Sequence, residues 1–245
     1  MTRYPYLDHG YVELIDHMGS DRRIAEAAWV SSNRAENRPD SDVARIVKYL
    51  ARENHWTPFG QTAITLRFRV PIFIARQLMR SNVGIVWNEE SRRYVDDLPQ
   101  FHFPKVFRTR SESMKQGSGE PLEQEENYRA RGLFFDACNQ SVGSYLSLLR
   151  MGIAPEQARA VLPVATYTTI IGTFNLSSLA RVYGLRSGPH AQAEIRELAA
   201  CIDQAVRSLG VFEVAWGALT GDGMSGAVER GVQDVVNGKV KESAQ

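Results

Sequence analysis

The sequence predicts an α+β fold in which a mixed or antiparallel sheet is flanked by long helices. Segments with strand-like alternation are interspersed with segments of helical periodicity, without the regular spacing of repeated βαβ units. The chain has 245 residues, of which 43% are hydrophobic and 23% charged, as in one large globular domain. We therefore expect a single domain over residues 1–220 and a weakly patterned tail over residues 221–245.

The first half of the chain contains the clearest strand. Apolar and polar residues alternate over residues 64–70, as expected for a strand with one buried face. Ser41 can cap a helix whose apolar residues recur at the i, i+3, i+4 and i+7 positions, and Pro71 suits the first turn of another. In order, we expect a strand at residues 12–15, helices at residues 21–30 and 41–54, a turn at residues 57–60, a strand at residues 64–70 and a helix at residues 72–80.

The second half is expected to be mostly helical. Residues 83–87 form an apolar loop or a short extended piece, and the polar residues 111–120 form a surface loop. A long helical pattern covers residues 121–151, which Gly132 or Gly143 could interrupt. We expect further helices at residues 155–162, 176–183 and 191–209, and a strand rich in β-branched and aromatic residues at residues 167–174.

Composition excludes several classes of function. The net charge of +1 gives no bulk attraction to nucleic acid or to an anionic membrane, so neither is an expected partner. No apolar run approaches the roughly 20 residues that span a bilayer, and no signal-peptide core occurs, so a cytoplasmic location is expected. The histidines lack the spacing of a zinc site, so no metal is expected, and no glycine-rich phosphate loop is present.

The chain has two cysteines, Cys138 and Cys201, each inside a helical pattern among alanines and leucines. Cysteines in such a setting are more often buried small hydrophobic residues than catalytic groups. We therefore expect neither of them to act as a nucleophile.

Cationic side chains gather between residues 76 and 94. Arg76 and Arg80 lie four residues apart on one helix face, where two cations repel unless an anion lies between them. Arg92 and Arg93 follow directly after Ser91 on a turn-like stretch. Guanidinium forks and a hydroxyl are the groups that bind a phosphate monoester, so this segment is a candidate phosphate site.

Two other interpretations of this segment compete with phosphate binding. Glu89 and Glu90 could pair with the arginines on a solvated face, and composition alone favours that arrangement. Ser91 could act as a nucleophile, but no histidine base lies near it in the local sequence. A phosphate contact is therefore the stronger hypothesis for Ser91.

Several motifs, taken together, resemble the pattern of flavin-dependent thymidylate synthases. The resemblance covers roughly residues 12 to 215, and its separated motifs occur in the family's order. They are Ala28-Trp29-Val30-Ser31, His55-Trp56-Thr57-Pro58-Phe59, residues 71–80 with Asn88-Glu89-Glu90-Ser91-Arg92-Arg93-Tyr94, Ala158-Arg159-Ala160-Val161-Leu162-Pro163, Thr173-Phe174-Asn175, and Leu185-Arg186-Ser187-Gly188-Pro189-His190-Ala191-Gln192.

The resemblance implies a fold like that of thymidylate synthase complementing protein and a homotetramer with active sites shared between subunits. It implies reductive methylation of deoxyuridine monophosphate (dUMP) to thymidine monophosphate (dTMP). FAD is the implied cofactor, and methylenetetrahydrofolate and NADPH are the implied co-substrates. In that family no cysteine attacks the uracil, which agrees with the interpretation of Cys138 and Cys201.

The resemblance also implies roles for individual residues. Arg186 would touch the pyrimidine and, with Arg80, serve catalysis, because a fixed guanidinium stabilises charge that develops on the uracil oxygens. Nucleotide binding is implied for Arg80, Glu89, Ser91, Arg92, Arg93 and Arg186, with Gln77 and Arg159 from a neighbouring subunit. Flavin binding is implied for Ser31, His55, Thr57, Arg80, Ser81, Asn82, Glu89, Asn175 and Arg181.

Taken singly, several of these residues have simpler interpretations. His55 could be a histidine favoured by the negative end of a helix dipole, and Asn175 could cap the helix that follows it. Arg159 and Arg186 could be solvated surface residues. His190 and Gln192 could mark no more than a helix start.

The sequence departs from the family pattern on the flavin and folate side. The Arg-His-Arg triplet of the family is Arg80-Ser81-Asn82 here, and one extra residue precedes Ser91. The family's usual arginine two residues after Asn175 is Ser177, and a usual histidine is Gln61. We hypothesise that Arg181, one helical turn from Ser177, replaces part of the lost charge.

Three functions remain open from the sequence. The first is thymidylate synthesis with FAD. The second is a related flavin-dependent modification of uracil C5, such as hydroxymethylation. The third is a nucleotide-binding or RNA-binding homologue without catalysis, although the lysines do not form the basic stripe that RNA binding favours.

Overall fold

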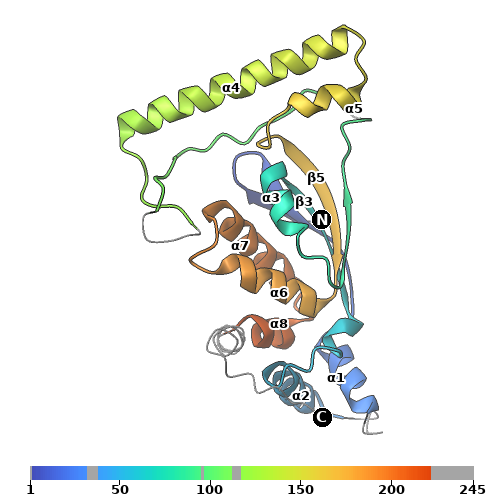
Figure 1. Cartoon of the computed structure of the whole chain (residues 1–245). Coiled ribbons are helices and arrows are strands. Elements are labelled where there is room, and N and C mark those ends of the chain that lie inside the picture. The colour runs from blue at the N-terminus through green and yellow to red at the C-terminus, as the bar shows by residue number, and fades with distance from the viewer. Residues whose placement is uncertain (1, 32–37, 95–96, 112–116, 222–245) are drawn as a thin grey trace, which may run out of the picture.

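The computed structural model describes residues 2–31, 38–94, 97–111 and 117–221, and it confirms the predicted α+β class (Figure 1). The strands are β1 (Arg3–Tyr6), β2 (Gly10–Met18), β3 (Ala63–Pro71), β4 (Ile85–Glu89) and β5 (Tyr167–Phe174). The helices are α1 (Asp21–Val30), α2 (Asp40–Arg52), η1 (Phe59–Gln61), α3 (Ile72–Leu78), α4 (Gln124–Arg150), α5 (Pro155–Ala158), η2 (Arg159–Val161), α6 (Leu176–Ser187), α7 (Ala193–Arg207) and α8 (Glu213–Thr220).

The strands form one sheet in the order β1-β2-β3-β5-β4, with every neighbouring pair antiparallel. In β3, Ile64, Leu66, Phe68 and Val70 are fully buried, while the residues between them are only half-buried. The alternation of apolar and polar residues over 64–70 therefore marks a strand with one buried face, as predicted. One face of the sheet packs into the core, and the other keeps partial contact with solvent.

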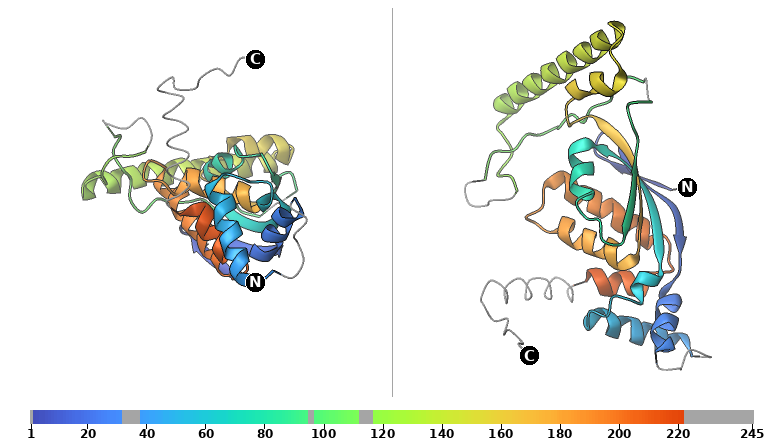
Figure 2. Two further views of the ribbon diagram at one scale, coloured as in Figure 1. Left: turned by 90° about the horizontal axis from the view of Figure 1, so that it is seen from below. Right: turned by 45° about the vertical axis from the view of Figure 1, so that its right-hand side comes forward.

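Helices α3, α6 and α7 lie together on one side of the sheet (Figures 1 and 2). The buried side chains of α7 recur at Ile195, Leu198, Ile202 and Ala205, which is the spacing of an amphipathic helix facing the core. Helices α1, α2 and α8 form a second group at the other end of the sheet (Figure 1). The hydrophobic core extends through both groups.

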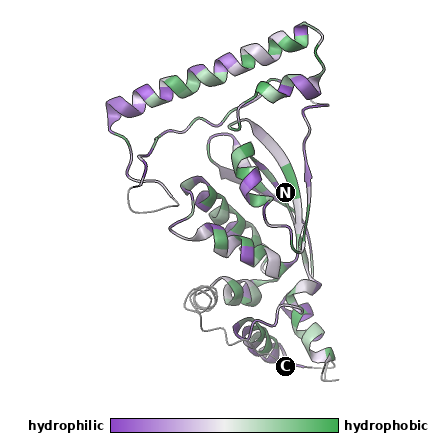
Figure 3. Cartoon of the chain, in the orientation of Figure 1, coloured by the Kyte–Doolittle hydropathy of each residue, from purple (hydrophilic) through white to green (hydrophobic). Residues whose placement is uncertain are grey.

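Helix α4 departs from expectation because it continues unbroken past both glycines. A Cβ atom added at Gly132 or Gly143 would meet nothing within 4 Å, so these glycines face open space. Each costs about 1 kcal/mol of helix propensity, which is too little to interrupt 27 residues. The helix stands apart from the sheet (Figure 2), and only Cys138 and Tyr145 on it are buried. Its polar and apolar residues are mixed along its length (Figure 3).

Other boundaries also differ from the predictions. The helix expected at residues 155–162 is the short α5 followed by the 3-10 turn η2. Of the two alternatives predicted for residues 83–87, the short extended piece is the one the structure favours, because residues 85–89 form the edge strand β4. Strand β1 and helix α8 had no predicted counterpart. The proposed tail, residues 221–245, lies outside the described residues apart from Gly221, so the division into domain and tail stays a prediction. In the described part of the chain, no helix is long and apolar enough to cross a membrane.

Candidate active site

A pocket of about 680 Å³ lies between α3, the residues after β4, η2 and the start of β5. Four guanidinium groups line it, against three carboxylates from Glu89, Glu90 and Glu156. We call it the arginine pocket. Its arginines are Arg76 on α3, Arg92 and Arg93 after β4, and Arg159 on η2.

Ser91 is the point at which two of these arginines meet. Its Oγ accepts hydrogen bonds from Arg93 Nε at 3.3 Å and from Arg159 Nη1 at 3.3 Å. No histidine lines the pocket among the residues described, so Ser91 has no base beside it. Arg159 of this chain lies beside Ser91, and the contribution of Arg159 from a neighbouring subunit stays a prediction. Ser91 is thus positioned as a polar contact rather than as an activated nucleophile.

The glutamates of the segment do not neutralise the arginines. Glu89 accepts a hydrogen bond from the Thr168 hydroxyl at 3.0 Å, and in the described part of the chain neither Glu89 nor Glu90 forms an ion pair with an arginine of the pocket. Arg92 contacts Asp97 instead, with Nη1 donating to the backbone oxygen at 3.0 Å and Nη2 3.5 Å from the carboxylate oxygen Oδ1. Its side chain is 12% exposed, and its Nε atom is buried without a partner among the described residues. A buried N–H without an acceptor is costly, so the pocket favours an anion.

A second group of predicted substrate residues lies away from this pocket. Arg186 on α6 donates from Nη2 to the backbone oxygen of Gln77 at 2.8 Å, and the Gln77 amide contacts Gln192 just before α7. Burial lowers the pKa of Arg186, and the nearby charge of Arg80 lowers it further. Within the described ranges, the Nε atom of Arg186 is also buried without a partner. None of Gln77, Arg80 and Arg186 lines the arginine pocket.

The residues predicted to bind flavin likewise do not all line one pocket. A pocket of about 570 Å³, which we call the α2–α6 pocket, opens beside the end of α2, η1, α8 and the start of α6. Its lining residues are Leu50, Ala51, Asn54, His55, Trp56, Phe59, Val83, Gly84, Asn175, Ser177, Ser178, Arg181 and Leu219.

Of the flavin residues, His55, Asn175 and Arg181 line the α2–α6 pocket, whereas Ser31, Thr57, Ser81 and Asn82 do not. Ser31 ends α1, and its hydroxyl donates to the backbone oxygen of Ala28. Trp56 also lines this pocket and is 64% exposed, although the motif containing it gave it no role of its own.

Asn175 is the helix cap that its sequence context predicts. Its side-chain oxygen accepts from the backbone N–H of Ser178 at 2.8 Å, at the first turn of α6. It lines the α2–α6 pocket at the same time, so the capping role and a ligand-contacting role are compatible.

The loop with the extra residue is held against α6. The backbone oxygen of Val83 accepts hydrogen bonds from Ser178 Oγ at 2.8 Å and from Arg181 Nη2 at 3.1 Å. Gly84 follows with a φ of +72°, in the left-handed region that favours glycine. Val83 and Gly84 therefore form a wall of the α2–α6 pocket, and Trp87 beyond them packs on Phe174 with ring centroids 5.1 Å apart.

Both cysteines are buried, as predicted, and neither lines either pocket. Burial raises the pKa of Cys138, and burial with the nearby Glu197 raises the pKa of Cys201 to about 11. A thiol with a raised pKa is a poor nucleophile at neutral pH. Neither thiol is therefore placed to act as a nucleophile in these pockets.

Comparison with known proteins gives consistent matches over most of the chain. Residues 13–209 match the family described as thymidylate synthase complementing protein. The flavin-dependent thymidylate synthase of Thermus thermophilus is 36% identical over 223 residues, which is 91% of this chain and 80% of that protein. The protein of the same name from Anaplasma marginale is 38% identical, over 82% of this chain and 69% of its own length.

Solved structures also match this chain over most of its length. A crystal structure of the UMP/dUMP methylase PolB from Streptomyces cacaoi, bound with 5-Br dUMP, has a TM-score of 0.77 and 29% sequence identity. The match covers 89% of this chain and 97% of that one. A second structure of PolB, bound with 5-Br UMP, has a TM-score of 0.76. On its sequence, fold and relatives, the chain belongs to the thymidylate synthase complementing protein family of flavin-dependent thymidylate synthases.

Proposed function

We propose that the protein methylates C5 of dUMP to form dTMP, with FAD as cofactor, methylenetetrahydrofolate as carbon donor and NADPH as reductant. The observation that carries the proposal is the arginine pocket. There, four guanidinium groups face three carboxylates, and the buried Nε of Arg92 has no partner in the described part of the chain. The family membership supports the reaction, and the crystal structures of PolB carry bromo-substituted UMP or dUMP.

The arginine pocket is suited to the phosphate of the nucleotide. Arg93 and Arg159 already converge on Ser91 Oγ, so a phosphate placed there would receive charge-assisted hydrogen bonds from both guanidinium groups. Arg92 adds a buried donor on the same wall. Glu89 is oriented by Thr168, which leaves its second oxygen to accept a hydrogen bond from a sugar hydroxyl.

The pyrimidine end is suited to Arg186 and Arg80. Burial and repulsion from Arg80 lower the pKa of Arg186, so its guanidinium favours a partner with negative charge. Negative charge on a uracil carbonyl oxygen, which makes C5 nucleophilic toward the carbon donor, would be stabilised by this guanidinium. Loss of a fixed donor of this kind typically lowers the rate by about 10²–10³-fold.

A complete site then takes residues from more than one copy of the chain. Gln77, Arg80 and Arg186 lie outside the pocket that holds Ser91 and Arg159. We propose that the nucleotide extends from the arginine pocket to Arg80 and Arg186, and that Gln77 and Arg159 of a neighbouring copy complete the site in the homotetramer that the family resemblance implies. Helix α4 offers exposed apolar side chains for such contacts, with Tyr128 78% and Leu133 74% exposed.

The α2–α6 pocket is suited to FAD. Its apolar walls and the exposed ring of Trp56 match planar aromatic rings, and Arg181 offers a cation to phosphates. When bound, FAD supplies the redox chemistry that reduces the transferred carbon to a methyl group. The residues of the chain bind and orient the nucleotide, and they stabilise charge on the pyrimidine.

Methylation of UMP is a second candidate, because the structural relative PolB is a UMP/dUMP methylase. The arginine pocket is equally compatible with hydroxymethylation of uracil C5 and with nucleotide binding that leads to no reaction. These functions differ from the proposal in a directly measurable product.

The test incubates the purified full-length protein, after its flavin spectrum is recorded, with methylenetetrahydrofolate, NADPH and either dUMP or UMP. We expect a flavin spectrum and a dUMP product heavier by one CH₂ unit in mass spectrometry. A gain of CH₂O would identify hydroxymethylation, and methylation of UMP alone would reassign the acceptor. A protein that binds dUMP but retains no flavin and forms no product would overturn the catalytic proposal.

A further inference from the structure

A third cavity, of about 290 Å³, lies between the segment 102–108, α3, α4 and the start of α7. We call it the His102 cavity. It shares only Val164 with the arginine pocket and no lining residue with the α2–α6 pocket. None of the proposed nucleotide or flavin residues lines it.

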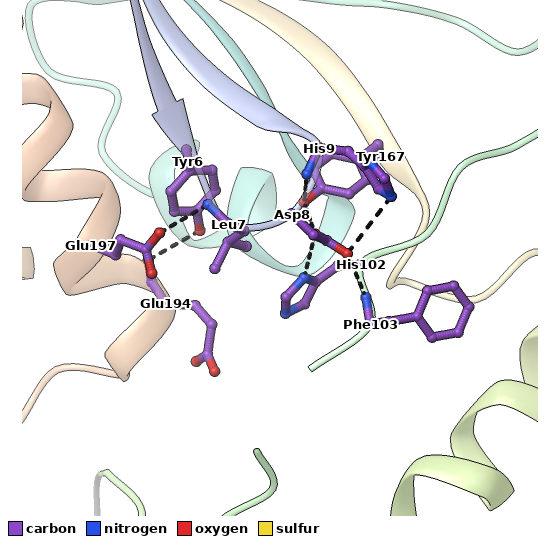
Figure 4. Close-up of polar contacts among 9 residues, drawn as sticks. All are labelled: Tyr6, Leu7, Asp8, His9, His102, Phe103, Tyr167, Glu194 and Glu197. Carbon is purple, nitrogen blue, oxygen red and sulfur yellow. Dashed lines mark hydrogen bonds and ion pairs between the residues drawn. The ribbon is translucent and has the colours of Figure 1, made fainter. Parts of the chain in front are cut away.

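His102 presents a hydrogen-bond acceptor in this cavity. Its Nδ1 lies 2.7 Å from Asp8 Oδ1, and its side chain is only 8% exposed (Figure 4). Burial tends to raise the pKa of Asp8, but hydrogen bonds from the Phe103 N–H, Tyr167 and His102 lower it to about 2. Asp8 engages Nδ1, so Nε2 is the ring nitrogen left to contact a ligand, and it is an acceptor when the ring carries one hydrogen, on Nδ1. Among the described residues, nothing donates a hydrogen bond to Nε2.

Glu194 presents a second acceptor. Its Oε1 accepts a hydrogen bond from Arg108 Nη2 at 2.6 Å, but its Oε2 is buried without a partner in the described ranges. Burial tends to raise the pKa of Glu194, and contacts led by Arg108 lower it, so the group is a carboxylate. Gln192 contributes to that lowering but makes no hydrogen bond to Oε2. A buried carboxylate oxygen without a donor is costly and favours a ligand that supplies one.

The remaining walls define the chemistry of that ligand. Phe73, Phe107 and Phe134 give aromatic surface. Among the described residues, the charged side chains that line the cavity are the Glu194 carboxylate and the Arg108 guanidinium, and the Asp8 carboxylate lies behind the ring of His102. Aromatic faces and carboxylates both attract cations.

We propose that the His102 cavity is a second binding site, for a small organic cation that carries a primary ammonium group on an apolar body. An ammonium has three N–H donors and no acceptor, which matches the partnerless Oε2 of Glu194 and the ring nitrogen Nε2 of His102 that Asp8 leaves unengaged. The apolar body of the ligand packs against the phenylalanines. The cavity holds a body about the size of one benzene ring with a short arm.

Benzylamine, which is an ammonium at neutral pH, is the probe, and benzyl alcohol is the matched neutral control. Titration calorimetry on the full-length protein is expected to show one saturable site per chain for benzylamine, and binding of benzyl alcohol about 10-fold weaker or undetectable. Equal binding of the two compounds, or no saturable binding of benzylamine, would overturn the proposal.

Glu194→Gln removes the charge with little change of size and is expected to weaken benzylamine binding by about 10-fold. The matched control is Glu197→Gln on the same helix. The Glu197 carboxylate accepts from the backbone N–H of Leu7 and does not line the cavity, so this variant should bind as the unsubstituted protein does. Equal losses in both variants would assign the effect to general charge rather than to the cavity, and would overturn the site.

A measurement without any substitution covers the case in which Glu194→Gln does not fold. In the protein labelled with ¹⁵N-histidine, benzylamine should move the Nε2 resonance of His102, while benzyl alcohol should not. The other four histidines serve as internal controls, because none of them lines the cavity. A shift spread evenly over all five histidines, or absent from His102, contradicts the proposal.

Discussion

Tyr167 donates its hydroxyl hydrogen to Asp8 Oδ1, the same oxygen that lies 2.7 Å from Nδ1 of His102 (Figure 4). Tyr167 begins β5 and lines the arginine pocket, whereas Asp8 lies in the turn between β1 and β2. The guanidinium of Arg69 lies over the ring of Tyr167, 5.7 Å from its centre. One carboxylate thereby ties the N-terminal hairpin to a wall of the arginine pocket and to the His102 cavity.

Asp8→Asn is expected to destabilise the protein in a pH-dependent way. The folded-state pKa of Asp8, about 2, lies below its ordinary value of 3.8, so the ionised carboxylate stabilises the fold fully above that ordinary value. The stabilisation disappears as the pH falls from about 4 to about 2. Urea unfolding across this range should show the variant and the unsubstituted protein converging at low pH.

Asp16→Asn is the control for that experiment, because Asp16 lies on the neighbouring strand and its carboxylate bonds to the backbone N–H of His17 next to it. A stability difference between Asp8→Asn and the unsubstituted protein that stays constant down to about pH 2 would refute the role assigned to the carboxylate.

Arg159→Gln is expected to weaken dUMP binding by about 10- to 100-fold, because it removes a charge-assisted hydrogen bond to the phosphate. Calorimetric titration with dUMP measures the effect. Arg129→Gln is the matched control, since Arg129 is an exposed residue of α4 that pairs with Glu125. If both variants bind dUMP as the unsubstituted protein does, the arginine pocket is not the phosphate site.

Gly84→Ala is expected to disturb the loop that bounds the α2–α6 pocket. A Cβ atom there would lie 2.3 Å from Ser178 Oγ and 2.5 Å from Asn175 Nδ2, and the φ of +72° is itself unfavourable for alanine. We expect a loss of about 1–3 kcal/mol in the free energy of unfolding and a lower flavin content. Gly132→Ala, in open space on α4, should instead stabilise the protein by up to about 1 kcal/mol. Equal effects at the two positions would contradict this account.

Arg181→Gln tests whether Arg181 replaces the charge missing from Arg80-Ser81-Asn82. Arg181 lines the α2–α6 pocket and also donates to Val83, so its loss removes a cation and loosens the loop. We expect flavin retention after gel filtration, read from visible absorbance, to fall by several-fold. Arg45→Gln, at an exposed position of α2 that pairs with Asp42, is the control. Unchanged retention in Arg181→Gln would rule out the compensation hypothesis.

The double variant Cys138→Ala, Cys201→Ala is expected to keep its methyl-transfer activity. Both thiols are buried away from the two pockets, so the variant should lose some stability through the cavities it creates, but no catalytic group. Product formation per folded protein is the measurement. Abolished turnover in a variant that still folds and still binds flavin and dUMP would assign a cysteine to the reaction.

The sequence predicted the arginine cluster, but not that its residues separate between the arginine pocket and the surroundings of Arg186. Residues 76–94 were recognised because arginines, Ser91 and glutamates lie close together along the chain. Helix α3 places Arg76 in the arginine pocket and leaves Gln77 beside Arg186, which is more than 100 residues away in sequence. No local pattern records that separation, because it depends on the packing of α3 between the sheet and α6.

Residues joined by distant contacts were missed for the same reason. Helix α8 begins where Asp21, on α1, accepts hydrogen bonds from the backbone N–H groups of Val214 and Ala215, each at 2.8 Å. A cap supplied from 193 or 194 residues away leaves no signal in the sequence around residue 213. Strand β1 likewise exists through its pairing with β2, since four residues lack a pattern of their own.

By itself, the sequence determined the fold class, the buried face of β3, the buried state of the cysteines and the family, because each depends on local periodicity or on contiguous motifs. The tertiary structure alone decided that Glu89 turns to Thr168 rather than to the pocket arginines, that Val83 and Gly84 form a pocket wall, and that Asp8 joins Tyr167 to His102. These outcomes depend on which distant side chains come within hydrogen-bonding distance, and that is fixed only when the sheet and its helices pack together.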